Sequence, residues 1–209
     1  MKSARNKFSK VFQFKITLNE VTPLVWRRIQ IPENYTFWDF HVAIQDSMGW
    51  LDYHLHEFTM LNSTTGKPIL IALPDPDKLD DRERLLDWEQ YPADYFSFEN
   101  RTAWYVYDFG DNWEHTIEFE GILVREKDRK YPICTDGQRA CPPEDVGSVS
   151  GYERFLEIIK DPKHEEHKEM IKWAGSKFDP DQFDPKKVKF SNPQTRLIKL
   201  FDDMRHPGL

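Results

Sequence analysis

The fold of this chain is decided in the stretch Tyr107-Asp108-Phe109-Gly110-Asp111-Asn112-Trp113-Glu114-His115. Residues 102–107 lead into it and are rich in aromatic and β-branched side chains, a composition typical of a strand. Residues 113–120 alternate between apolar and polar side chains, which places His115 on the buried face of a second strand. The glycine, aspartate and asparagine in between favour a turn. The stretch therefore predicts a β-hairpin with an aspartate on each side of its turn.

The polar residues of this hairpin have two interpretations. Asp108, Asp111 and His115 form a polar cluster that carries chemistry, or the aspartates cap their own turn and the histidine is a hydrogen-bonded part of the core. The second is the more common use of such residues. The sequence leaves both open.

The composition indicates a globular protein with an acidic surface. Of the 209 residues, 39% are hydrophobic, 31% are charged and 14% are aromatic, which is enough to fill a core. The net charge of -7 argues against a broad nucleic-acid-binding surface, which needs a basic excess. No stretch approaches the roughly 18 apolar residues of a membrane span, so we expect no membrane partner. Two cysteines, and a basic start with no apolar core behind it, predict a cytoplasmic location.

The N-terminal part predicts a strand-strand-helix-strand unit. Residues 11–18 and 24–31 alternate as two strands, and the short connection between them favours a hairpin. The segment Thr36–Asp39 has the pattern of a capping box and Gly49 is a stop signal, so we expect a helix across this hairpin. Residues 54–60 are the third strand.

The next segments have weaker signals. Residues 68–73 predict a short apolar strand. Residues 74–84 are acidic and contain proline, which favours a plain loop over a lid-like one. Residues 85–98 are ambiguous, and a short helical turn at 85–88 is one interpretation of their start.

Two histidines in the third strand indicate a metal site. On a strand, His54 and His56 point the same way and can offer two imidazoles to one divalent ion. We expect His115 to join them, with Asp108 or Asp111 as a further ligand. The alternative is that one histidine hydrogen-bonds a carboxylate and the other is half exposed.

Residues 131–147 predict a loop, since two prolines after Cys141 fix an extended backbone. Six residues separate Cys134 from Cys141, too many for a zinc knuckle. The thiols are small buried hydrophobes, ligands beside the histidines, or the halves of a disulfide. Glu144 and Asp145 cap the next helix, pair with an arginine, or belong to a binding site. Amphipathic patterns then predict helices at 151–160, 164–174 and 193–204.

Several of these segments, taken in order, resemble one protein family, the plasmid pRi ORF-3-like proteins. Members occur on bacterial plasmids, as insertion-sequence passengers and in archaeal genomes. The resemblance spans roughly residues 11 to 190, and its combination of motifs is specific. The matching segments are 23–28, 48–50, 54–58, 107–115, 140–147, 151–152 and 178–183.

The resemblance implies an association with mobile genetic elements and brings no established activity. The family's recurring polar positions correspond to Trp26, Arg27, Arg28, His54, His56, Asp108, Asp111, His115, Cys141, Glu144 and Asp145.

The segments together predict one α+β domain over residues 1–209. Its sheet is mixed and mostly antiparallel, with a β-grasp-like start and C-terminal helices packed alongside. Within it we expect a flexible basic N-terminus at 1–10, a sheet-rich part at 11–125 and a loop and helical part at 126–209.

Three functions from different classes fit these residues. The first is a binding or adaptor module for a protein or nucleic-acid partner, with Trp26, Arg27 and Arg28 on an exposed strand as interface anchors. Two arginines alone do not supply the many phosphate contacts of ordinary DNA binding. The second is a metal-dependent hydrolase that uses the histidines and aspartates. The third is a structural protein without a catalytic site.

Overall fold

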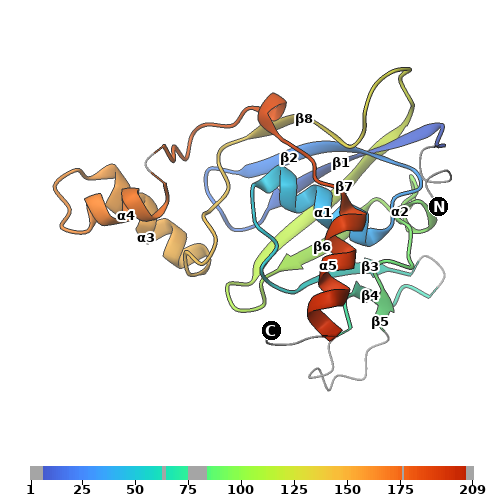
Figure 1. Ribbon diagram of the computed structural model, residues 1–209, viewed down its shortest axis with the longest axis horizontal. Coiled ribbons are helices and arrows are strands. Elements are labelled where there is room, and N and C mark those ends of the chain that lie inside the picture. Colours follow the sequence, from blue (N-terminus) through green and yellow to red (C-terminus); the bar gives the residue numbers. More distant parts are fainter. Residues whose placement is uncertain (1–6, 63–64, 75–83, 176, 206–209) are drawn as a thin grey trace.

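A computed structural model describes residues 7–62, 65–74, 84–175 and 177–205, and within them an eight-stranded sheet carries α1 on one face (Figure 1). The strand order is β5-β4-β3-β6-β7-β1-β2-β8, and every neighbouring pair is antiparallel except β4 with β5. The predicted α+β class with a mixed, mostly antiparallel sheet is confirmed. The strands are β1 (Lys10–Leu18), β2 (Val25–Pro32), β3 (His56–Leu61), β4 (Pro68–Ala72), β5 (Arg84–Leu86), β6 (Thr102–Tyr107), β7 (Trp113–Val124) and β8 (Ile133–Gln138). The helices are α1 (Phe37–Met48), α2 (Pro92–Tyr95), α3 (Ser148–Lys160), α4 (His167–Trp173) and α5 (Pro193–Arg205), with the 3-10 helix η1 (Pro185–Lys187).

The central hairpin forms as its sequence predicts. β6 and β7 pair in the middle of the sheet, with Tyr107 opposite Trp113. Trp113, His115 and Ile117 are buried, while Glu114 and Glu118 on the opposite face of the strand are exposed. The buried face of this hairpin thus forms part of the core.

Helix α1 begins and ends at the predicted residues. Thr36 Oγ1 accepts a hydrogen bond from the Asp39 N–H at 3.2 Å, and the Asp39 carboxylate accepts one from the Thr36 N–H at 3.1 Å. Gly49 ends the helix with a φ of 92°, in the left-handed region that favours glycine. Phe40 of the helix packs on Phe14 of β1 with ring centroids 4.7 Å apart, so α1 covers the β1–β2 hairpin.

The C-terminal helices lie in two places. Helix α5 runs beside α1 (Figure 1), where Arg196 pairs with Asp46 at 2.5 Å and Asp52 at 3.2 Å, and Leu197 packs with Trp38. Helices α3 and α4 project from one end of the sheet in the same view, and Phe155 anchors α3 to the main core. The described residues contain no helix long and apolar enough to cross a membrane.

Three predicted elements differ from the structure in their bounds or in their type. Strand β3 begins at His56, because Asp52 takes a left-handed φ of 63° and the chain bends at His54 before the strand starts. The helical turn predicted at 85–88 is replaced by β5, which gains a parallel partner in β4. The loop predicted at 131–147 contains β8, whose residues pair with β2 at the edge of the sheet, so the sheet-rich part extends beyond residue 125.

Some predictions fall partly outside the described residues. These are the flexible basic N-terminus, of which 1–6 are not described, and the acidic loop, of which 75–83 are not described. The strand-strand-helix-strand order of the start is present, with β1 and β3 separated in the sheet by β6 and β7. Its β-grasp-like character stays a prediction.

Candidate metal centre

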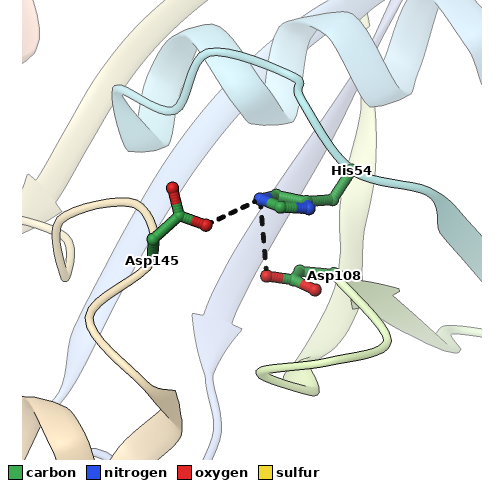
Figure 2. A group of neighbouring side chains, drawn as sticks. All are labelled: His54, Asp108 and Asp145. Atoms are coloured by element: carbon green, nitrogen blue, oxygen red, sulfur yellow. Dashed lines mark hydrogen bonds and ion pairs between the residues drawn. The ribbon is translucent and has the colours of Figure 1, made fainter.

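Three side chains converge at the mouth of the central hairpin. Figure 2 shows His54 between two aspartates, Asp108 and Asp145, which come from different segments of the chain. His54 Nε2 lies 3.1 Å from Asp145 Oδ1 and 3.6 Å from Asp108 Oδ2. One ligand atom from each residue lies within 4.8 Å of the others. Two atoms bound to a common ion at roughly 2.0–2.2 Å lie no more than about 4.4 Å apart, a limit that both separations from His54 Nε2 meet.

The turn holds Asp108 so that one carboxylate oxygen is directed at His54. Asp108 directly follows β6 with a left-handed φ of 57°, and its N–H donates to the Leu55 carbonyl at 2.9 Å, which ties the hairpin to the His54 segment. Its Oδ1 accepts a hydrogen bond from the Gly110 N–H at 2.9 Å. Its Oδ2 faces His54. The turn-capping and site-forming interpretations of this aspartate are therefore compatible.

The loop that carries Asp145 is fixed by contacts to two other segments. Asp111 Oδ2 accepts a hydrogen bond from the Gly147 N–H at 3.1 Å, which joins this loop to the hairpin turn. On the other side, Trp50 Nε1 donates to the Pro142 carbonyl at 2.9 Å. Asp145 is thus held beside His54 by contacts on both sides.

Glu144 adds a further carboxyl group next to the triad of His54, Asp108 and Asp145. It accepts hydrogen bonds from the Leu51 N–H at 2.6 Å and from the Tyr107 hydroxyl at 3.1 Å. Burial raises the pKa of Glu144, and the negative charge of Asp145 adds to this, against the opposing effects of its hydrogen bonds and of His54. A carboxyl with a raised pKa beside possible metal ligands is suited to move protons.

The donor set suits a divalent cation. One imidazole nitrogen and two carboxylate oxygens are ligands for zinc, manganese or iron, and three protein ligands leave coordination positions open. The side chain of Asp145 is 67% exposed and that of His54 is 31% exposed, so solvent and a small molecule can reach the ligand atoms.

The other predicted histidine ligands lie elsewhere. His56 is buried, its Nε2 pairs with Asp87 Oδ2 at 2.9 Å, and its ring stacks on that of His41 with centroids 3.5 Å apart. His115 is buried and donates from Nδ1 to the Tyr105 carbonyl at 3.2 Å, and burial lowers its pKa to about 4. Among the described residues, the cluster with metal-ligand spacing contains His54 and neither of these two.

The three anchors predicted on β2 do not share a surface. Trp26 and Arg28 lie on the partly exposed face of the strand, and Arg28 pairs with Glu120 at 2.7 Å and Asp136 at 3.0 Å. Arg27 points the other way and is only 1% exposed. The expectation of an exposed Trp-Arg-Arg surface is wrong for Arg27, because alternate residues of a strand face opposite sides.

Neither cysteine reaches the triad. Both thiols are free, and Cys141 belongs to the main core. Burial raises the pKa of Cys134 to about 11 and raises that of Cys141 further. Cys141 lies in the core and Cys134 packs against it, so the small-hydrophobe interpretation fits both best.

Comparisons with known proteins agree with the resemblance seen in the sequence. The chain is 34% identical to the uncharacterized protein y4hQ of Sinorhizobium fredii over 200 residues, which cover 94% of this chain and 93% of that protein. A crystal structure of a protein of unknown function, MM3350 from Methanosarcina mazei Go1, matches with a TM-score of 0.81 and 48% identity over 88% of this chain and 100% of that one. The family model of the plasmid pRiA4b ORF-3-like proteins matches residues 10–187. The chain that carries this His-Asp-Asp cluster therefore belongs to the plasmid pRiA4b ORF-3-like family.

Proposed function

We propose that this protein is a metal-dependent hydrolase whose divalent cation is held by His54, Asp108 and Asp145. The observation that carries the proposal is the convergence of these three ligand atoms, within 4.8 Å of one another, from three separate segments. Four of the seven predicted binding residues lie at this point. Two are the ligands Asp108 and Asp145, and the other two, Asp111 and Glu144, lie beside them.

The residues around the triad supply the other parts of a hydrolytic site. A divalent cation would polarise the scissile group and lower the pKa of a nearby water molecule. Glu144 would accept the proton of the attacking water and return it to the leaving group, a role that suits a carboxyl whose pKa is raised. The Tyr107 hydroxyl, which accepts a hydrogen bond from the Tyr53 N–H at 3.0 Å, would keep Glu144 in place.

A groove next to the triad offers room for a substrate. It has a volume of about 480 Å³, and Asp145 belongs both to its lining and to the triad. Apolar side chains of α3 and α4, among them Phe155, Ile158 and Trp173, form much of its wall. A concave site with an apolar wall and a few polar groups at one end is the usual form of a small-molecule site.

Metal reconstitution of the purified protein tests the proposal. The metal-free protein would be loaded with zinc, manganese or magnesium and assayed on p-nitrophenyl esters, phosphoesters and an anilide. We expect metal-dependent turnover that Glu144→Gln lowers by about a hundredfold, the size of a lost general base, while metal binding is retained. Glu157→Gln, on the exposed side of α3, is the matched control and should leave turnover unchanged. Turnover that survives chelation or Glu144→Gln, or none with any of the three metals, contradicts the proposal.

A binding module for a protein partner is the second candidate. The observation in its favour is the sheet face away from α1, where Trp26 and Trp104 are partly exposed and Lys15 lies 5.6 Å from the Trp26 ring. Arg28 is already paired with two acids there, so its charge is not free for the phosphate contacts that nucleic acid requires. Cross-linking in a cell extract should give a protein adduct that Trp26→Ala and Trp104→Ala abolish. An adduct unchanged by either substitution would remove this candidate.

A further inference from the structure

Arg27 of β2 carries a buried charge that no carboxylate neutralises within the described residues. Its Nε donates to the Ser47 carbonyl at 2.8 Å, and its Nη1 donates to the carbonyls of Trp26 at 2.8 Å and Gln138 at 3.0 Å. Its guanidinium lies over the ring of Phe183 at 3.6 Å from the centroid. All of these partners are neutral, whereas buried charges in proteins are normally paired with an opposite charge.

The guanidinium also retains an unused donor. Nη2 makes no hydrogen bond to any described residue, although Arg27 is only 1% exposed. Arg27 lines a cavity of about 420 Å³ between the end of α1, residues 140–141 and residues 178–189. An arginine keeps its charge at every physiological pH, so the positive charge at the wall of this cavity is permanent.

The rest of the cavity suits an anion with an apolar body. Lys187 and Lys189 line its outer part and are exposed, which adds positive charge at the entrance. Two acids also line it, but Asp46 is engaged by Arg196 and Ser191, and Asp184 caps the N–H of Lys186. Its apolar wall includes Met48, Phe178, Phe183 and Val188.

We infer that this cavity binds a small ligand through an oxyanion, a carboxylate or a phosphate, that pairs with Arg27 Nη2 and is attracted by Lys187 and Lys189. The geometry of an arginine with a free terminal nitrogen matches such oxygens. The site is separate from the proposed metal centre and does not depend on it. The chain links the two, because Cys141 lines the cavity and Asp145, four residues later, is a metal ligand.

The probes are inorganic phosphate and sodium hexanoate, titrated into the full chain at constant ionic strength against sodium chloride. Calorimetry gives the affinity, and the Nε–H resonance of Arg27 in a spectrum of ¹⁵N-arginine-labelled protein reports contact at the guanidinium. We expect one of the two probes to bind and to shift this resonance, and which of them binds distinguishes a phosphate from a carboxylate ligand. The double variant Lys187→Gln/Lys189→Gln should weaken binding by about fivefold, as expected for lost charge at a screened site, and Arg27→Met should abolish it.

The adjacent residue provides the matched control. Lys186 is exposed like its neighbour but does not line the cavity, so Lys186→Gln should leave the affinity unchanged. If Arg27→Met does not fold, the Arg27 resonance and the double lysine variant still decide the question. The inference is overturned if neither probe binds more tightly than chloride, if binding leaves the Arg27 resonance unmoved, or if Lys186→Gln weakens binding as much as the double variant does. Arg27 would then serve only to hold the end of α1 against β2 and β8.

Discussion

His56 and His54 are two residues apart, yet one lies in the core and the other at the surface between two aspartates. In the core, the rings of His41 and His56 stack at 3.5 Å with an interplanar angle of 8°, and each has its own carboxylate, Asp52 at 2.7 Å and Asp87 at 2.9 Å. The side chains of both histidines are fully buried. At the surface, His54 is approached by two carboxylates and remains open to solvent.

The difference shows what turns a histidine–aspartate pair into a candidate metal site. In the core, each buried imidazole has a single carboxylate, and in the His56–Asp87 pair one atom of each group, His56 Nδ1 and Asp87 Oδ1, has no hydrogen-bond partner in the described structure. A second carboxylate and solvent access at the same imidazole give three ligand atoms and a path for the ion. We therefore expect replacement of a core histidine to change stability and replacement of a triad residue to change metal binding.

The largest expected effect is a difference in stability between a variant of the buried histidine and a variant of the surface histidine. His56→Ala removes the partner of Asp87, a carboxylate that is 0% exposed and whose other oxygen has no hydrogen bond in the described structure. We expect it to lower the free energy of unfolding by about 3–5 kcal/mol, the cost of breaking a buried pair. His54→Ala should cost less than about 1 kcal/mol, since its pairs are partly exposed. Urea denaturation of both variants measures this, and equal losses would erase the distinction.

The next effect is a dependence of stability on pH. Burial lowers the pKa of His115 from 6.5 to about 4, so its contribution to stability is fully present above pH 6.5 and is lost as the pH falls through about 4. A shift of this size corresponds to about 3 kcal/mol. His41 has a pKa lowered by burial and by His56, and acts in the same direction.

Replacing His115 tests whether its protonation causes this dependence of stability on pH. His115→Gln keeps a donor for the Tyr105 carbonyl but cannot take up a proton, so stability should fall less steeply between pH 6.5 and 4 than in the parent. Denaturant midpoints across this pH range provide the measurement. If the variant and the parent lose stability equally steeply over this range, the pKa of His115 is not lowered in the folded protein.

A smaller effect concerns the loop that brings Asp145 to the triad. Asp111→Ala removes the hydrogen bond to Gly147 and leaves the three ligands themselves intact. We expect metal affinity to fall by about tenfold, or about 1.4 kcal/mol, the value of one hydrogen bond that positions a ligand. Asp94→Ala, an exposed aspartate of α2, is the control and should bind the metal as the parent does. An affinity that Asp111→Ala leaves unaltered would show that the loop holds its place without this contact.

The sequence predicted the elements that short-range signals specify. The capping box at Thr36 and Asp39, the stop at Gly49 and the alternation that buries His115 depend on residues a few positions apart, and the structure has all of them. Strand β8 was missed because the two prolines after Cys141 led to a loop prediction for all of 131–147, and only pairing with β2 makes this edge segment a strand.

The candidate metal site was predicted in part. Asp108, His54 and Asp145 were each named as candidate site residues. The predicted metal ligands, however, were His54, His56 and His115, with an aspartate of the hairpin, and Asp145 was not among them. The rule that residues i and i+2 face the same way holds within a strand, and the bend at His54 places this histidine outside it. The contact between His54 and Asp145 joins residues 91 positions apart, and no local pattern reports such a distance.

Elemental analysis of the tag-free protein, dialysed against zinc or manganese and then against buffer, tests the central claim most directly. The parent and His115→Gln should each retain about one equivalent of metal, as three protein ligands allow, and His54→Ala and Asp145→Asn should retain none. A metal-free parent would contradict the account. So would a bound metal that His54→Ala leaves in place and His115→Gln removes, because the site would then lie among the buried histidines.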